Sequence, residues 1–324
     1  MPAVVLFPLH LLCSGFFHEE GHISNMIEGR ILRAQSGFYW VETSQGVLEC
    51  RLRGRLKKVA LNSDIAVIGD MVNVEIVSPG YGAIEEVFPR TTRLSRVAAF
   101  SGGHREDLIV ANVDVALIVV ALAQPEFHPR MLDRYLVICE NNNIEARIIA
   151  SKADLVSPMA AEAALKPYHD IGYTTCIASV QTGQGITEIQ SWLPGNVSVV
   201  TGKSGVGKSS LLNAIHPQLT LAVGDVSGAV NKGRHTTTVA QLIPLGNGGY
   251  VADTPGIREI GLWKISDEAL AYGFKEFQEY LDDCRFSDCT HRHEPDCAVL
   301  HALHEGHISR ARYESYVRLL AGEE

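Results

Sequence analysis

Residues 202–209 have the residue types and the spacing that hold a nucleotide phosphate. They read Gly-Lys-Ser-Gly-Val-Gly-Lys-Ser and match the pattern G-x-x-x-x-G-K-[ST] between a strand-like apolar segment and a helix-like segment. Glycines let consecutive backbone N–H groups turn toward a phosphate, and the helix that follows adds the positive end of its dipole. We therefore expect a phosphate-binding loop in which Lys208 contacts the β- and γ-phosphates and Ser209 ligates Mg²⁺. The predicted loop residues are Gly202, Lys203, Ser204, Gly205, Val206, Gly207, Lys208, Ser209 and Ser210.

Two polar segments downstream have the character of switch segments. Asp253 follows the strand-like residues 250–252 and begins Asp-Thr-Pro-Gly, in which the acid can hold the water shell of Mg²⁺ and the Gly256 amide can meet a γ-phosphate. Residues 233–238 form a polar loop before it, and Thr237 is the candidate for a hydroxyl ligand of Mg²⁺. Each segment alone is a weak signal, but their order and spacing are typical of the two switches of a GTPase.

Guanine recognition is predicted from two segments that precede the phosphate loop. Residues 151–154 read Ser-Lys-Ala-Asp and residues 179–183 read Ser-Val-Gln-Thr-Gly, each after an apolar strand-like segment. Asp154 would accept from N1 and N2 of guanine, Lys152 would cover the base, and the Val180 amide would contact O6. Because adenine cannot satisfy this acid, the pairing selects guanine. Taken alone, Ser-Lys-Ala-Asp is also typical of a solvated turn. The remaining predicted contacts of these loops are Ser151, Ala153 and Ser179.

Cysteines and histidines near the C-terminus have the spacing of a metal site. Cys284, Cys289 and Cys297 lie with His291 and His293 in a polar, turn-rich segment. Three thiolates and one imidazole complete a tetrahedral Cys₃His zinc site, with either histidine as the nitrogen donor. Since such a site has no open position, we expect one structural Zn²⁺ that holds a small helical domain. The other cysteines lie on apolar segments where core packing is expected: Cys13, Cys50, Cys139 and Cys176.

Hydrophobic patterning predicts a multidomain chain that would position these residues. Residues 26–96 alternate apolar and polar residues between glycine turns, which indicates an all-β barrel of the oligonucleotide/oligosaccharide-binding (OB) type or an SH3-like barrel. Residues 97–261 alternate apolar strands with amphipathic helices, which is typical of a parallel α/β domain. Residues 262–324 predict a helical domain around the cysteines, and residues 1–25 are interpreted as an N-terminal extension.

Composition and charge exclude several classes of protein. The 324 residues are 46% hydrophobic and 20% charged, which excludes disordered, collagen-like and coiled-coil chains. The apolar run 115–123 is too short to span a membrane, and Pro2 and Pro8 interrupt an N-terminus that makes a poor signal peptide. A net charge of −9 argues against a protein that coats nucleic acid without specificity. We expect a cytoplasmic monomer with no membrane partner.

One short segment is strongly basic despite that charge. Residues 51–58 carry five of the 28 lysines and arginines, and Arg51, Arg53, Arg55 and Lys57 occupy alternate positions. The alternation predicts a strand with one cationic face. Two interpretations remain open, an edge strand guarded by charge or a strand that faces RNA.

The order of these segments resembles the circularly permuted GTPases of small-ribosomal-subunit biogenesis, the ribosome small subunit-dependent GTPase A family. The resemblance covers residues 26–320 and rests on GKSGVGKSS, GRHTTT and DTPG. It implies a bacterial cytoplasmic enzyme that binds GTP and GDP with Mg²⁺, contacts the 30S subunit through 16S rRNA late in its maturation, and hydrolyses GTP faster there. It also favours His291 over His293. Two features depart from the family: Ser151 stands where an Asn is usual, which predicts a weaker contact in the base loop, and residues 1–25 have no counterpart, which a start codon assigned upstream of Met26 would explain.

Hydrolysis needs a group that orients the attacking water. Ras-like GTPases use a Gln directly after the second switch motif, but Ile257 stands there in this chain. A potassium ion held by an Asn at the fourth loop position is one substitute, but that position is Gly205. We predict that His235 orients the water. Lys208 and Thr237 are further predicted catalytic residues, and the predicted magnesium ligands are Ser209, Thr237 and Asp253. The alternatives are an RNA-binding module with a passive guanine nucleotide site and a P-loop kinase or ATPase, which Asp154 disfavours.

Overall fold

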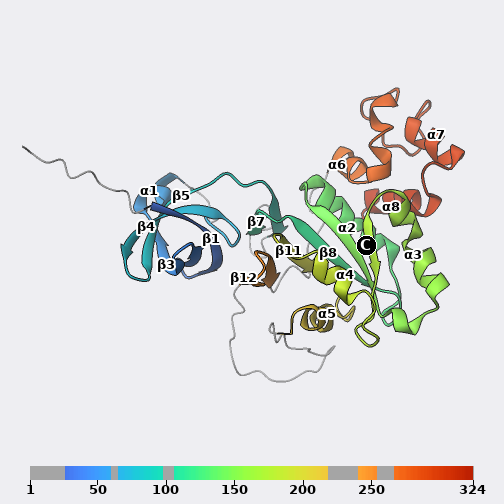
Figure 1. Ribbon diagram of the computed structural model, residues 1–324. Helices are drawn as coiled ribbons and strands as arrows, with labels where there is room; N and C mark the ends of the chain where they lie inside the picture. Colours follow the sequence, from blue (N-terminus) through green and yellow to red (C-terminus); the bar gives the residue numbers. More distant parts are fainter. Residues whose placement is uncertain (1–25, 60–64, 98–105, 218–239, 254–265, 324) are drawn as a thin grey trace, which may run out of the picture.

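The computed structural model describes residues 26–59, 65–97, 106–217, 240–253 and 266–323. A β-barrel lies at one end, an α/β domain in the middle and a helical region at the other end (Figure 1). The predicted N-terminal extension, residues 1–25, lies outside the described residues. Within these ranges, no helix combines the length and the apolar character that a membrane crossing requires.

Five strands close the N-terminal barrel, which confirms the predicted all-β barrel. They lie in the order β1 (Met26–Gln35), β2 (Phe38–Thr43), β3 (Gly46–Leu52), β5 (Tyr81–Val87) and β4 (Met71–Ser78), and β1 also pairs with β4. β3 and β5 run parallel, while the other pairs are antiparallel. The alternating apolar residues of these strands point inward and form the core of the barrel, among them Ile31, Val41, Leu48, Val72, Val74 and Ile84.

The predicted cationic strand over residues 51–57 is wrong. β3 ends at Leu52, and α1 (Gly54–Val59) begins two residues later. Leu56 packs on the same core as Leu52, and a four-residue spacing of apolar side chains suits a helix. Arg53 forms ion pairs with Glu75 and Glu85, and Arg55 pairs with Glu85 at 2.8 Å. Two of the predicted RNA-facing side chains are therefore engaged by carboxylates of the barrel itself.

The central domain contains a sheet in the order β10-β9-β8-β11-β13-β12, in which β12 is antiparallel and the others are parallel. Its strands are β8 (Val115–Ala121), β9 (Glu145–Ser151), β10 (Thr174–Ile177), β11 (Val197–Thr201), β12 (Gln241–Pro244) and β13 (Tyr250–Asp253). Its helices are α2 (Pro129–Asn141), the short helix η1 (Ala153–Leu155), α3 (Pro158–Asp170), α4 (Ile186–Ser191) and α5 (Lys208–Ile215).

Helices cover both faces of this sheet. In β8, Ala116, Ile118 and Val120 belong to the hydrophobic cluster that includes α2 and α3. The alternate residues Val115, Leu117, Val119 and Ala121 belong to the cluster that includes α4 and α5. A strand buried on both faces reads as a continuous apolar run, as residues 115–121 do, which is typical of parallel sheets.

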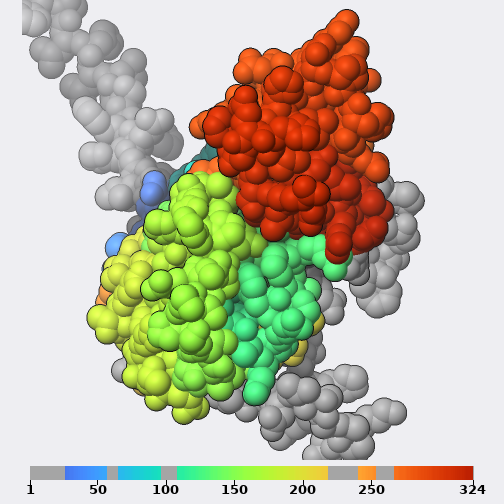
Figure 2. Space-filling model, turned by 90° about the vertical axis from the view of Figure 1, so that its right-hand side faces the viewer, coloured from blue at the N-terminus to red at the C-terminus, as the bar shows by residue number. Residues whose placement is uncertain are grey.

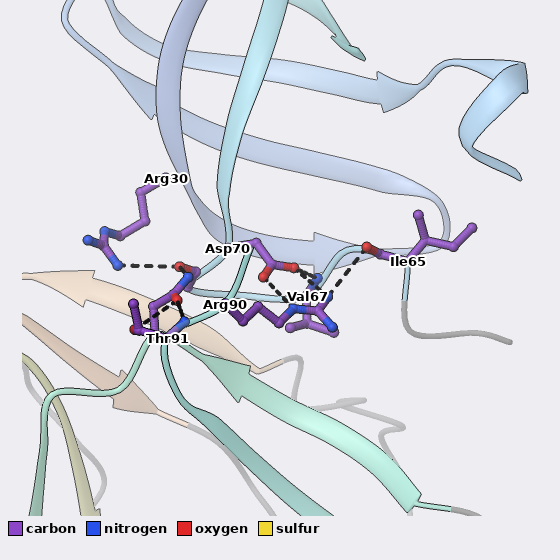
Figure 3. Close-up of polar contacts among 8 residues, drawn as sticks. Arg30, Ile65, Val67, Asp70, Arg90 and Thr91 are labelled. Atoms are coloured by element: carbon purple, nitrogen blue, oxygen red, sulfur yellow. Dashed lines mark hydrogen bonds and ion pairs between the residues drawn. The ribbon is translucent and has the colours of Figure 1, made fainter. Parts of the chain in front are cut away.

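The barrel and the central sheet are one continuous sheet of eleven strands, because β1 pairs with β12. A two-stranded sheet of β6 (Arg93–Val97) and β7 (Glu106–Ala111) connects them in the chain. Figure 3 shows the polar contacts beside this connection. The fully buried carboxylate of Asp70 accepts from Arg90 Nε at 2.7 Å and from the Val67 N–H at 2.8 Å, and Asn112 Nδ2 donates to the Gly69 carbonyl at 3.0 Å.

The C-terminal region is helical and packs on the central domain (Figure 2). It contains α6 (Asp267–Tyr272), the short helices η4 (Lys275–Phe277) and η5 (Leu281–Asp283), α7 (Ala298–Glu305) and α8 (Arg310–Leu320). Its small core includes Phe274, Phe277 and Tyr316, together with Val137 from α2. Arg312 of α8 reaches across to Asp133 of α2 and also binds Glu276. These three side chains are 2%, 1% and 5% exposed, so the two parts are joined by a buried ion network.

Candidate functional site

The segment between β11 and α5 has the geometry of a phosphate-binding loop. Gly202, Gly205 and Gly207 adopt φ angles of 136°, 81° and 94°, a region that favours glycine. A Cβ on Gly202 would lie 2.1 Å from the Val119 carbonyl oxygen, so the first turn of the loop has room only for glycine. Lys208, the first residue of α5, folds over the loop and its Nζ donates to the carbonyls of Gly202 at 2.6 Å and of Lys203 at 2.7 Å.

The base-loop residues that follow β9 are tied directly to this phosphate loop. The Ser151 hydroxyl lies 2.7 Å from the Val206 carbonyl and 3.1 Å from the Val120 carbonyl, either of which can accept its single proton. The Lys152 ammonium donates to the Gly205 carbonyl at 2.7 Å and also to the Gln124 carbonyl. Ser151 therefore ties the base loop to the phosphate loop through one donor, where an Asn amide would have two.

Asp154 of the first base loop and Ser179 of the second base loop are in direct contact. The buried Ser179 hydroxyl donates to Asp154 Oδ1 at 2.5 Å and accepts from the Thr182 N–H at 3.3 Å. Because the hydroxyl engages one carboxylate oxygen, it fixes the orientation of the Asp154 side chain. The half-exposed Val180 follows directly on the same turn. The structure therefore brings both sequence-distant base loops together.

These loops enclose a pocket of about 390 Å³ at the carboxyl ends of β8, β9 and β10. In a parallel sheet this edge is where ligands bind. Sequence reasoning missed Gln124, which lies in the loop after β8. Its position directly after a buried parallel strand was the signal that could have identified it. The pocket is lined by Gln124, Ser151, Lys152, Asp154, Leu155, Ala178, Val180, Gln181, Val206, Gly207, Ser210 and Leu211.

Only some of the predicted magnesium ligands and water-orienting residues lie in the part of the chain that the structure describes. Ser209 lies in the first turn of α5, and Asp253 is the last residue of β13, at the same edge of the sheet as the phosphate loop. His235, Thr237 and Gly256 lie outside the described residues, as do the whole of residues 233–238 and the part of the second switch segment that follows Asp253.

The Cys/His segment brings four donor atoms together, so that the cluster could hold a metal ion. The ligand atoms of Cys284, Cys289, His291 and Cys297 all lie within 4.8 Å of one another. His291 Nδ1 is 3.5 Å from the Sγ atoms of Cys284 and Cys297, which are 3.9 Å apart. Tetrahedral donors about 2.0–2.3 Å from one ion lie about 3.5–3.8 Å from each other, so this spacing suits a tetrahedral metal.

Protonation in the cluster follows from burial. Burial lowers the pKa of His291, which keeps the imidazole neutral and ready to ligate. Burial and the neighbouring sulfur atoms raise the pKa of Cys289 to about 12, so that this thiol is protonated in the metal-free protein at neutral pH. A metal that binds here must displace thiol protons.

The loop that carries His291 is held from two directions. The Glu294 carboxylate accepts from the Thr290 hydroxyl and from the N–H groups of Thr290, Arg292 and His293. Burial alone would raise the pKa of this carboxyl, but these hydrogen bonds outweigh it and lower the pKa. From α8, Tyr313 donates to the His291 carbonyl at 2.8 Å and Tyr316 donates to the Thr290 carbonyl at 2.9 Å. The histidine of the cluster is thus positioned by groups outside the donor set.

Fold and site together define a P-loop GTPase in which the predicted base-recognition segments precede the phosphate loop. It is attached to a barrel and to a helical region whose Cys₃His cluster could hold a metal ion. Family models agree: the RsgA GTPase model matches residues 87–263 and the RsgA N-terminal domain model matches residues 28–84. The chain therefore belongs to the RsgA GTPase family, and it is a GTPase. Membership in this family implies GTP and GDP with Mg²⁺ as ligands and favours hydrolysis over the passive nucleotide site considered as an alternative.

Individual relatives match along nearly their whole length. The curated "Small ribosomal subunit biogenesis GTPase RsgA" of Gemmatimonas aurantiaca is 45% identical over 294 residues, which cover 90% of this chain and 95% of the relative. The protein of the same name from Moorella thermoacetica is 44% identical over 295 residues, with 91% and 97% covered. Among solved structures, YjeQ from Thermotoga maritima is similar at a TM-score of 0.77, 34% identity and coverage of 92% and 98%. YloQ, described as a circularly permuted GTPase, is similar at a TM-score of 0.73, 32% identity and coverage of 93% and 96%.

Proposed function

We propose that this protein binds the small ribosomal subunit through 16S rRNA, assists late maturation of that subunit, and hydrolyses GTP faster while bound. The curated relatives, whose name refers to small-subunit biogenesis, support the partner. The observation that carries the RNA contact is a surface on the barrel that combines guanidinium groups with aromatic rings. The protein acts in the cytoplasm as a monomer.

This guanidinium–aromatic surface consists of Arg33, Phe38, Trp40 and Arg51 on β1, β2 and β3. Arg33 pairs with Trp40 across two strands, and its guanidinium lies 4.6 Å from the centre of the Trp40 ring. The exposed Arg51 lies 4.3 Å from the centre of the Phe38 ring. Flat guanidinium and aromatic groups stack on unpaired bases, while the positive charge contacts phosphates. In OB-type barrels this region of the sheet binds oligonucleotides, so the fold supports the same assignment by analogy.

In the nucleotide site, each predicted residue has a distinct role. The backbone amides of residues 202–210 hold the phosphates, and Lys208 exchanges its two carbonyl contacts for phosphate oxygens. Asp154, oriented by Ser179, accepts from N1 and N2 of guanine. Bound Mg²⁺ supplies neutralisation of phosphate charge, and its protein ligands are Ser209, Thr237 and Asp253, the last through water. His235 orients the attacking water.

Zinc is the metal that suits the Cys₃His cluster, with His291 as its nitrogen ligand. Three sulfur donors and a neutral imidazole at tetrahedral spacing suit Zn²⁺, and hard cations such as Mg²⁺ prefer oxygen. Because all positions are protein ligands, the ion stabilises the C-terminal region rather than reacting with substrate.

Binding and turnover assays test this function. GDP and GTP should bind and ATP should not, and 30S subunits should raise the turnover of GTP. Replacing Arg33 and Arg51 by Gln should weaken 30S binding and flatten its salt dependence by about 0.7–0.9 log unit for each phosphate that the variant no longer neutralises. Arg310→Gln is the matched control, since Arg310 is 87% exposed on α8, far along the chain from the barrel. Equal affinity and equal salt slope in the Arg33/Arg51 variant would refute the RNA surface.

A further inference from the structure

We propose that Tyr250 and Glu42 form a coupling pair that transmits binding at the barrel to the magnesium side of the nucleotide site, with Tyr250 as its positioning residue. This inference rests on the proposed function, because it explains how contact with the 30S subunit accelerates hydrolysis. It concerns residues between the two sites rather than in either of them.

A single row of paired residues crosses the molecule from the barrel to the end of β13. Trp40 of β2 is paired with Arg33 of β1, Arg33 with Gln241 of β12, and Gln241 with Asp253 of β13. The first two belong to the guanidinium–aromatic surface, and the last is the predicted magnesium residue. Since the row is held by strand pairing, a displacement of β1 is passed directly to β12 and β13.

The Tyr250–Glu42 pair locks the other end of the same strands. Tyr250 is the first residue of β13, and its hydroxyl donates to Glu42 Oε2 of β2 at 2.5 Å. Arg30 of β1 lies 5.3 Å from the centre of the Tyr250 ring and also donates to the Gly69 carbonyl at 3.3 Å. Burial, followed by the hydrogen bond to Glu42, raises the pKa of Tyr250, so the phenol remains a donor at neutral pH.

The surrounding contacts make this junction stiff. Leu242 of β12 and Ala252 of β13 belong to the same buried cluster as Ile31 and Val41 of the barrel. Near the barrel's connection to the central domain, the buried Asp70 carboxylate binds Arg90, which precedes β6 (Figure 3). The neighbouring Gly69 carbonyl accepts from Asn112, which follows β7, so the segment before β4 is tied to one end of the β6–β7 sheet. Packed elements respond as units rather than by continuous deformation. The barrel and the β12–β13 edge therefore move together, and the pair from Tyr250 to Glu42 fixes their relative register.

The test removes one hydroxyl. Tyr250→Phe keeps the ring under Arg30 and deletes only the donor to Glu42. We expect its free turnover, GTP affinity and 30S affinity to stay within about twofold of wild type, while the stimulation factor, kcat with 30S divided by kcat without, falls at least about fivefold. Tyr81→Phe is the matched control, because Tyr81 is a barrel tyrosine whose side chain is 56% exposed. It should retain full stimulation.

A second variant and a second measurement test whether Tyr250 and Glu42 act through their shared hydrogen bond. Glu42→Leu removes the acceptor of the Tyr250 hydroxyl and should reduce stimulation. The Tyr250→Phe/Glu42→Leu double variant should lose no more than the stronger single variant, because both substitutions remove the same hydrogen bond. In the nucleotide-free protein, Tyr250→Phe should speed amide hydrogen exchange in β12. Undiminished stimulation in Tyr250→Phe, with normal stimulation of the wild type, would overturn this inference alone. A wild type that 30S subunits do not stimulate would overturn the proposed function as well.

Discussion

Replacing Arg312 by Met should detach the C-terminal region from the central domain. Arg312 donates from Nη1 to Asp133 and from Nε and Nη2 to the Glu276 carboxylate at 2.7 and 2.9 Å. The Arg312 and Asp133 side chains are 2% and 1% exposed, so water cannot replace the missing donors without opening the interface. The ring centre of Phe274 lies 4.6 Å from the Arg312 guanidinium, and a Met side chain keeps apolar contact with this ring. The variant therefore tests the loss of the positive charge and its hydrogen bonds separately from the loss of packing.

The expected loss of stability follows from the two carboxylates that remain. Breaking a buried ion pair from one side costs about 3–5 kcal/mol, a large part of the roughly 5–15 kcal/mol that stabilises a typical protein. Urea denaturation should show this loss, and hydrogen exchange should locate it in α2 and α8. Adding Asp133→Asn and Glu276→Gln to Arg312→Met should recover part of the stability, because no unpaired carboxylate then remains buried.

Arg310→Met provides the matched control for this prediction. Arg310 lies on the same helix, pairs with Glu314 and is 87% exposed, so its replacement should cost no more than about 0.5 kcal/mol. If Arg312→Met were no less stable than Arg310→Met, the buried network would not be what joins the two parts.

Three further predictions address the nucleotide site and the metal. Asp154→Asn should lower GTP affinity at least about tenfold, or about 1.4 kcal/mol, and shift preference toward xanthine nucleotides; unchanged GTP binding in equilibrium titrations would refute the guanine assignment. Zinc should copurify at about one atom per chain, and Cys289→Ser should lose the zinc while GTP binding is kept. Because the pKa of the Cys289 thiol is raised to about 12 and the thiol must release its proton to bind the metal, zinc affinity should fall as pH falls. Metal analysis of chelator-free preparations that finds no zinc would reject this site. His235→Ala should bind GTP and 30S normally but lose roughly 10²-fold in 30S-stimulated turnover, and normal stimulated turnover would assign the water to another group.

The sequence predicts best those features whose chemistry lies within a short segment. The phosphate loop is specified by glycines that alone fit its turns, as the 2.1 Å approach of a Cβ on Gly202 to Val119 illustrates. The cysteine spacing likewise predicts the donor cluster, but the choice of His291 over His293 came from family resemblance. In the structure His291 lies with the three cysteines, and tyrosine hydroxyls of α8 bind the backbone of its loop.

Contacts between distant segments could not be read from local patterns. The alternate basic residues after Arg51 suggested a strand, but Leu56 packs as a helical residue on the barrel core and Glu75 and Glu85 engage Arg53. The interaction of Ser151 with the Val206 carbonyl joins residues 55 positions apart, and substitution of Asn by Ser had suggested only a weaker contact. The β1–β12 pairing that merges two predicted domains into one sheet depends on a single residue pair.

The late position of α8 in the chain affects how the protein folds during synthesis and where proteolysis acts on it. Arg312 is synthesised 179 residues after Asp133, so α2 emerges with a carboxylate that it cannot bury alone. The nascent central domain must keep that face hydrated until α8 arrives, and α8 then holds the loop around His291. After a single proteolytic cut between α7 and α8, both contacts would depend on non-covalent binding of the α8 segment alone. Such a cut would therefore act on the C-terminal region and leave the nucleotide pocket, whose lining residues lie between positions 124 and 211, uncut.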